Sequence, residues 1–162
     1  MDRQELLSRL ELARRRVAEL ARGELPAGLT EPDPGASERW EAKQVWAHMA
    51  EFVGYWRDQF EAVIRDFDGA PVPFGRVKTD AGRIGSIEMG RHRPLAALAA
   101  DVERSVDRFA DFTRMLDDAA WQAQGLHPTL GVMALPRMVD RFVVSHLDEH
   151  ADQLEGLRTA QP

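Results

Sequence analysis

The chain contains no cysteine among its 162 residues. Without cysteine it can form no disulfide, offer no thiolate to zinc and use no cysteine nucleophile of its own. Any bound metal must therefore be held by nitrogen and oxygen ligands. Any thiol that takes part in a reaction must come from a small molecule.

Long apolar runs and a basic charge balance are also lacking. No run of about 18 apolar residues is present to cross a bilayer, and the N-terminal residues Met1 to Glu5 are too polar for a signal peptide. The formal net charge is −6 at pH 7 and no basic helix stands out, which argues against nucleic acid as the main partner. We therefore expect a cytoplasmic protein with neither a nucleic-acid nor a membrane partner.

Length and composition fit an ordinary soluble globule. The chain has a mass of 18.2 kDa, with 44% hydrophobic and 30% charged residues, which is typical of globular domains. A chain of this length is expected to form one domain over residues 1–162 with a single core. A homodimer is left open beside a monomer.

Apolar residues recur at three- and four-residue intervals in four segments, the pattern of amphipathic helices. Four such helices predict an all-α fold, a four-helix bundle. The proline-rich stretch from Leu25 to Gly35 is expected to be a loop. The predicted helices are Arg3–Ala21, Arg39–Asp66, Pro94–Leu116 and Leu135–Arg158.

The segment from Gly69 to Arg93, between the second and third predicted helices, lacks helical periodicity because prolines and glycines interrupt it repeatedly. It is expected to be a long crossover loop, with only Arg83–Met89 as a short extended piece, and strand signals are confined to it. Structureless connections of more than about 20 residues are uncommon and are often functional lids or crossovers.

Three histidines lie on predicted apolar helix faces. His146 and His150 are four residues apart, so both imidazoles occupy one face of the last helix, in line with Phe142. His48 lies within the apolar stripe of the second helix. A lone histidine there would be a hydrogen-bonded core residue, whereas this arrangement favours a divalent metal inside the bundle. Of the neighbours that could orient the imidazoles, Glu149 and Gln153 are closer to the site face than Asp148.

The remaining histidines and aromatic residues favour structural roles. His127 precedes a proline and is expected to make a turn contact, and His92 is expected at the surface. Tyr55, on the other side of its helix from His48, is a weak catalytic candidate. The four tryptophans are first of all packing residues, with Trp56 as the one considered for lining the pocket: Trp40, Trp46, Trp56 and Trp121.

Basic residues outnumber acidic ones in the crossover loop, although the whole chain is acidic. Arginine binds carboxylates and phosphates with bidentate geometry, so these residues are candidates for binding an anionic thiol or its partner. The alternative is a solvated loop with solubilising charges. The basic residues are Arg76, Lys78, Arg83, Arg91 and Arg93, against Asp80 and Glu88.

Two blocks of the sequence resemble the DinB/YfiT-like superfamily. The first is Trp40-Glu-Ala-Lys-Gln-Val-Trp-Ala-His48-Met49, and the second runs from His127-Pro-Thr-Leu-Gly to His146-x-x-x-His150-x-x-Gln153-Leu. The resemblance covers nearly the whole chain in order. It departs from commoner members at Glu149, where a histidine often stands, and at Met49, where leucine is usual.

The resemblance implies a four-helix bundle whose metal ion is held by His48, His146 and His150. Characterised relatives include transferases and isomerases that use low-molecular-weight thiols such as mycothiol or bacillithiol. Three imidazoles would leave an open position on zinc, the arrangement of a catalytic site, and nickel, iron or manganese would also accept nitrogen ligands.

Two classes of function follow. The first is a metal-dependent enzyme that activates a small thiol for transfer to, or isomerisation of, a small electrophile, with a metal-dependent hydrolase as its water-using alternative. The second is a non-catalytic, stress-response bundle that binds metal or ligand. An arginine and alanine bias, with Lys43 and Lys78 as the lysines, suggests a GC-rich genome and favours mycothiol as the thiol.

Overall fold

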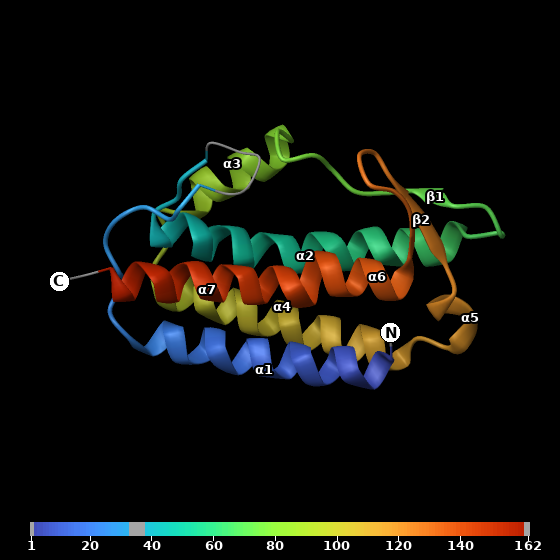
Figure 1. Ribbon diagram of the computed structural model, residues 1–162, viewed down its shortest axis with the longest axis horizontal. Coiled ribbons are helices and arrows are strands. Elements are labelled where there is room, and N and C mark those ends of the chain that lie inside the picture. Colours follow the sequence, from blue (N-terminus) through green and yellow to red (C-terminus); the bar gives the residue numbers. More distant parts are fainter. Residues whose placement is uncertain (1, 33–37, 161–162) are drawn as a thin grey trace.

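The computed structural model describes residues 2–32 and 38–160. Helical rods run along the long axis of the molecule (Figure 1). The helices form four such rods, which confirms the predicted four-helix bundle. Around the bundle, α1 and α2 each pack against both α4 and α7. The first three rods are α1 (Arg3–Arg22), α2 (Ala42–Asp66) and α4 (Leu95–Met115), and the fourth consists of α6 (Leu135–Val139), the π-helix η1 (Asp140–Val144) and α7 (Ser145–Thr159).

The start of α2 lies three residues later than predicted, at Ala42 instead of Arg39. Trp40 is bonded instead to Thr30 in the preceding loop: the Trp40 amide donates to Thr30 Oγ1 (2.9 Å), and the Thr30 amide donates to the Trp40 carbonyl (2.8 Å). These bonds hold the chain extended, and the helix then begins at the Glu41 cap, whose amide donates to Gln44 Oε1 (3.0 Å). Of the predicted loop from Leu25 to Gly35, residues 33–35 lie outside the described part.

The crossover between α2 and α4 is present but is not structureless. It contains a short strand, β1 (Val72–Pro73), and a helix, α3 (Ala81–Gly90), so the prediction of an extended piece at Arg83–Met89 was wrong. The Asp80 side chain caps α3 by accepting from the Arg83 amide (2.8 Å). The helix packs on α2, and Figure 1 shows it above one end of that helix.

A β-hairpin between α4 and α6 was also not predicted. After the short helix α5 (Asp118–Trp121), β2 (Gln124–His127) and β3 (Gly131–Ala134) pair antiparallel, and β1 adds to β2 in parallel. The sheet order is β1-β2-β3. Because β1 lies in the crossover, this sheet ties the crossover to the end of the bundle opposite α3 (Figure 1).

The π-helix η1 interrupts the last rod just before the histidines. Its wider turn places the Ser145 amide on the Asp140 carbonyl. Ser145 Oγ also donates to Asp140 Oδ1 (3.0 Å), and the Arg9 guanidinium from α1 lies 2.8 Å from the same oxygen. Such single π-turns often occur next to functional sites, and here the turn sets the angular position of His146 and His150.

Within the described residues, no helix has the length and apolar character needed to cross a membrane.

Candidate metal centre

The three predicted histidines meet in the interior of the bundle. His48 projects from α2, and His146 and His150 project from α7. One ring nitrogen of each lies within 4.8 Å of those of the other two. The ring centroids are 4.6 Å apart for His146 and His150, 4.9 Å for His48 and His150, and 5.2 Å for His48 and His146. Such a group could hold one metal ion.

Aromatic side chains wall this cluster. The Trp40 ring packs edge-on to His48 (5.2 Å) and lies stacked on His150 (6.0 Å), while the Phe52 ring stacks on His146 (4.5 Å). His48 and His150 are 2% and 5% exposed, but His146 is only half-buried. His146 is therefore the most exposed of the three histidines.

Burial disfavours the charged form of two of the imidazoles, His48 and His146. It lowers the pKa of both His48 and His146 well below the ordinary histidine value, because the charged form loses its hydration. The neighbouring His150 lowers both pKa values further, and the positive charge of Arg83 acts in the same direction. Neutral imidazole is the form that binds metals, so the lowered pKa values of His48 and His146 favour the metal-binding form of these two rings.

Side-chain partners orient two of the rings. His150 Nδ1 donates to Gln153 Oε1 (2.8 Å), which leaves Nε2 as the electron-pair donor. His48 Nδ1 lies 3.5 Å from Glu51 Oε2. The closeness of Gln153 was anticipated, whereas Glu51 was missed, although its spacing of three residues from His48 on one helix was a usable signal. Asp148 turns away to Arg16 (3.0 Å), and Glu149 is exposed.

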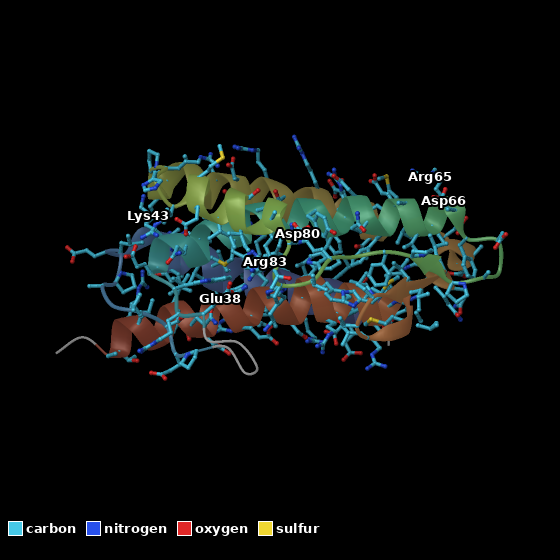
Figure 2. All side chains as sticks on the ribbon, turned by 90° about the horizontal axis from the view of Figure 1, so that it is seen from above. Glu38, Lys43, Arg65, Asp66, Asp80 and Arg83 are labelled. Atoms are coloured by element: carbon cyan, nitrogen blue, oxygen red, sulfur yellow. The ribbon has the colours of Figure 1, made fainter. Side chains whose placement is uncertain are left out.

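Arg83 lies beside the histidine cluster. This buried residue donates to the Lys78 carbonyl (2.8 Å) and lies over the Trp40 ring (5.1 Å). Figure 2 shows it between Asp80 and Glu38, and the Glu38 carboxylate is 3.5 Å away. The positive charges of Arg83 and Lys78 also lower the pKa of His146, although burial and the two other histidines have larger effects.

The other predicted anion-binding residues take part in ion pairs. The two terminal nitrogens of Arg76 contact the two carboxylate oxygens of Glu51. Arg91 pairs with Glu41 and Glu88 at the start of α2 and the end of α3, and Arg93 pairs with Asp101 of α4. A role for Arg91 and Arg93 in anion binding stays a prediction.

The remaining candidates make turn or packing contacts or lie at the surface. His92 is exposed. His127 is buried at the end of β2, and its Nδ1 accepts from the Thr129 amide (3.3 Å), the predicted turn contact. Trp56 stacks on Phe142 (4.2 Å), one turn before His146. Trp40, and not Trp56, is thus the tryptophan whose ring packs on the histidine cluster.

A sequence model of the DinB superfamily matches residues 3–154, so the chain belongs to this superfamily. No functionally curated protein matches it.

Solved structures share the fold at low identity. Bacillus subtilis YfiT, described as a probable metal-dependent hydrolase with an unusual four-helix bundle topology, superposes with a TM-score of 0.73 at 17% identity, covering 97% of this chain and 86% of YfiT. A mycothiol-dependent maleylpyruvate isomerase gives 0.71 at 16% identity and covers 95% of this chain. This chain spans 61% of the isomerase's length. A protein from Clostridium difficile 630 gives 0.68 at 10% identity, covering 100% and 98% of the two chains.

Proposed function

We propose that this DinB superfamily protein is a metal-dependent enzyme that activates a low-molecular-weight thiol, such as mycothiol, for transfer to or isomerisation of a small electrophile. The observation that carries the proposal is the convergence of His48, His146 and His150, with ring nitrogens within 4.8 Å, in a chain that has no cysteine. The nucleophilic sulfur must then enter from solution.

The donor set fits a divalent transition metal. Neutral imidazole suits zinc, nickel, iron and copper, and three protein nitrogens are typical of catalytic zinc, whose fourth position takes water or substrate. Burying the imidazoles of His48 and His150 in an aromatic surround costs hydration, and a bound ion would offset that cost. When bound, such an ion lowers the pKa of a coordinated thiol or water and so supplies a nucleophile near neutral pH.

The surrounding residues suit an anionic small molecule. Trp40 and Phe52 exclude water from the inner side of the cluster, which strengthens electrostatic interactions there. On the half-buried His146 side, Arg83 and Lys78 contribute positive charge. Positive charge at this entrance would attract the thiolate or a carboxylate of its partner and hold it beside the metal.

A metal-dependent hydrolase is the second candidate. It is favoured by the likeness in fold to YfiT, which is described as a probable metal-dependent hydrolase and superposes with a TM-score of 0.73. Against it, Glu51, the carboxylate beside His48, has both oxygens engaged by Arg76, which makes it a poor general base for activating water.

A non-catalytic binding role is the third candidate. It is favoured by the Trp40 ring, which packs on two of the three histidines. Because His146 is half-buried and not fully enclosed, the enzyme proposal is preferred.

The test begins with elemental analysis of purified protein, then compares metal-loaded with metal-stripped protein on a generic electrophile. Mycothiol, bacillithiol, glutathione and a thiol-free control are the four arms. A metal-dependent rate with a thiol supports the proposal, and one in the thiol-free arm identifies a hydrolase. No metal-dependent rate in any arm leaves the binding role.

A further inference from the structure

Arg76 and Glu51 form a bidentate ion pair that joins the crossover to α2. Arg76 Nη1 lies 2.5 Å from Glu51 Oε1, and Nη2 donates to Oε2 (2.7 Å). The side chains are only 10% and 17% exposed. Two parallel charge-assisted hydrogen bonds fix the plane of the carboxylate as well as its position, so Glu51 is far more restrained than a surface glutamate.

Further contacts hold Arg76 itself. Its guanidinium lies over the Tyr55 ring at 3.9 Å, a cation–π geometry. Just before it, the Gly75 amide donates to Gln59 Oε1 (2.8 Å). Gly75 has a positive φ of 90°, and a Cβ there would lie 2.6 Å from the His127 ring. The backbone that carries Arg76 is therefore fixed against both α2 and the hairpin.

The restrained carboxylate faces His48. Glu51 Oε2 is 3.5 Å from His48 Nδ1, and this buried Nδ1 has no hydrogen-bond partner of ordinary length among the described residues. The side chain of His48 is 3% exposed. A buried imidazole N–H without an acceptor is unfavourable, and a nearby carboxylate is a usual acceptor for the second ring N–H of a metal-binding histidine.

Glu51 is not itself placed as a metal ligand. The residues whose ligand atoms converge within 4.8 Å are the three histidines, and both Glu51 oxygens are taken by Arg76. We infer that Glu51, held by Arg76, is a positioning residue that keeps His48 protonated on Nδ1 and turned so that Nε2 faces the metal. This inference rests on the proposed metal site.

The test compares wild type with Glu51→Gln, Arg76→Lys and a matched control, Glu11→Gln. Glu11 also forms a bidentate pair, with Arg14 (2.7 and 3.0 Å), but on α1. The dissociation constant of Zn²⁺ is measured by chelator competition, and the ring ¹⁵N shifts of His48 report its tautomer. Circular dichroism and thermal unfolding of the metal-free proteins monitor the fold.

We expect Glu51→Gln to weaken zinc binding by about 10- to 100-fold, the usual effect of losing a partner of a metal-bound histidine, and to disturb the Nδ1–H signal of His48. Arg76→Lys keeps the charge but loses the two-pronged geometry, so it should lie between wild type and Glu51→Gln. Glu11→Gln should bind zinc like wild type.

Equal zinc affinity in wild type and Glu51→Gln, or an unchanged His48 tautomer, overturns the inference while leaving the metal site intact. Equal weakening by Glu11→Gln also overturns it, since the effect would then be a general loss of stability. A wild-type protein that binds no zinc, nickel, iron or manganese refutes the proposed site and the inference together.

Discussion

The two halves of α2 face different interiors. Its C-terminal half contributes Trp56 and Phe60 to an aromatic cluster, in which Phe60 lies 6.1 Å from Phe109 and Trp56 stacks at 4.2 Å on Phe142. Its N-terminal half contributes His48 to a cluster of imidazoles. The same helices, α2 and the last rod, thus build an apolar core at one place and a polar one at another.

The aromatic half of α2 contributes mainly to stability, whereas the histidine half does not. Buried aromatic side chains are among the largest contributors to folding, and favourable ring pairs add about 0.5–1.5 kcal/mol each beyond the area they bury. Buried imidazoles contribute little by packing and lose hydration. A polar cluster kept in the interior at such a cost indicates function. Changes in one half of α2 should therefore leave the property of the other half largely intact.

The largest expected effect is on metal content. His150→Ala removes one of the three converging nitrogens and should abolish most bound metal, while the metal-free protein stays folded because the aromatic half is untouched. The variant should also lack the stabilisation that metal gives wild type, about 2.7 kcal/mol at a metal concentration of 100 times Kd. Native mass spectrometry and thermal unfolding measure both.

His92→Ala is the control for His150→Ala, because His92 is exposed and should leave metal content unchanged. Undiminished occupancy in His150→Ala would rule out the three-histidine site.

The aromatic half should show the reverse behaviour. Phe60 is 0% exposed, and Phe60→Ala leaves a cavity among rings that cannot fully collapse, so the free energy of unfolding should fall by about 3–5 kcal/mol. The zinc affinity of the folded fraction should stay within about threefold of wild type. Urea denaturation and chelator competition test the pair of outcomes, and a large affinity loss would show that the two halves are coupled.

Acidification should lower both the stability of the metal-free protein and its zinc occupancy, through the buried histidines of α2 and the last rod. The pKa of buried His48 is well below the ordinary value, so the folded protein binds fewer protons than the unfolded chain below about pH 6.5. Stability of the metal-free protein should therefore be level above that pH and fall as the pH drops further, by at most about 1.4 kcal/mol per pH unit for each such group. Zinc occupancy should fall in the same direction, because protons compete for the nitrogens.

His48→Gln, which cannot titrate, should flatten that stability profile in denaturation curves recorded from pH 7.5 to 5. An equally steep profile in this variant would mean that other groups cause the acid sensitivity.

Helical periodicity was enough to predict the bundle and the position of the histidines. Residues Met138, Phe142, His150 and Leu154 lie on one buried line as expected, because burial of an apolar face is a strong constraint on a long helix. The π-turn in η1 leaves no periodic signal, since it is held by long-range contacts such as Arg9 with Asp140 (2.8 Å).

The helix inside the crossover was not predicted, because tertiary contacts override local preference there. Gly82, Gly85 and Gly90 weaken the helix signal of α3, yet Gly90 allows close approach to α2, where an added Cβ would lie 2.7 Å from Ala47 Cβ. The capping residue Asp80 was the signal that was missed. The hairpin was hidden for a similar reason, because the inward-facing residue Gly125 has no side chain and leaves room for Phe74.

The smallest expected effect distinguishes the arginines of the crossover. Arg93 is half exposed and pairs with Asp101 at the surface (2.6 Å, side chains 46% and 24% exposed), and such pairs contribute about 0–1 kcal/mol. Arg93→Gln should therefore change neither stability nor the KM for an anionic thiol beyond error.

Arg83, which is buried and whose positive charge lowers the pKa of His48 and His146, should behave differently. Arg83→Gln should raise that KM several-fold, because the anion loses a cation beside the metal. Steady-state kinetics at two ionic strengths measure both, since salt screens the exposed charge far more than the buried one. An Arg93→Gln variant with the same rise in KM as Arg83→Gln would place anion recognition at the exposed end of α3 instead of at the histidine cluster.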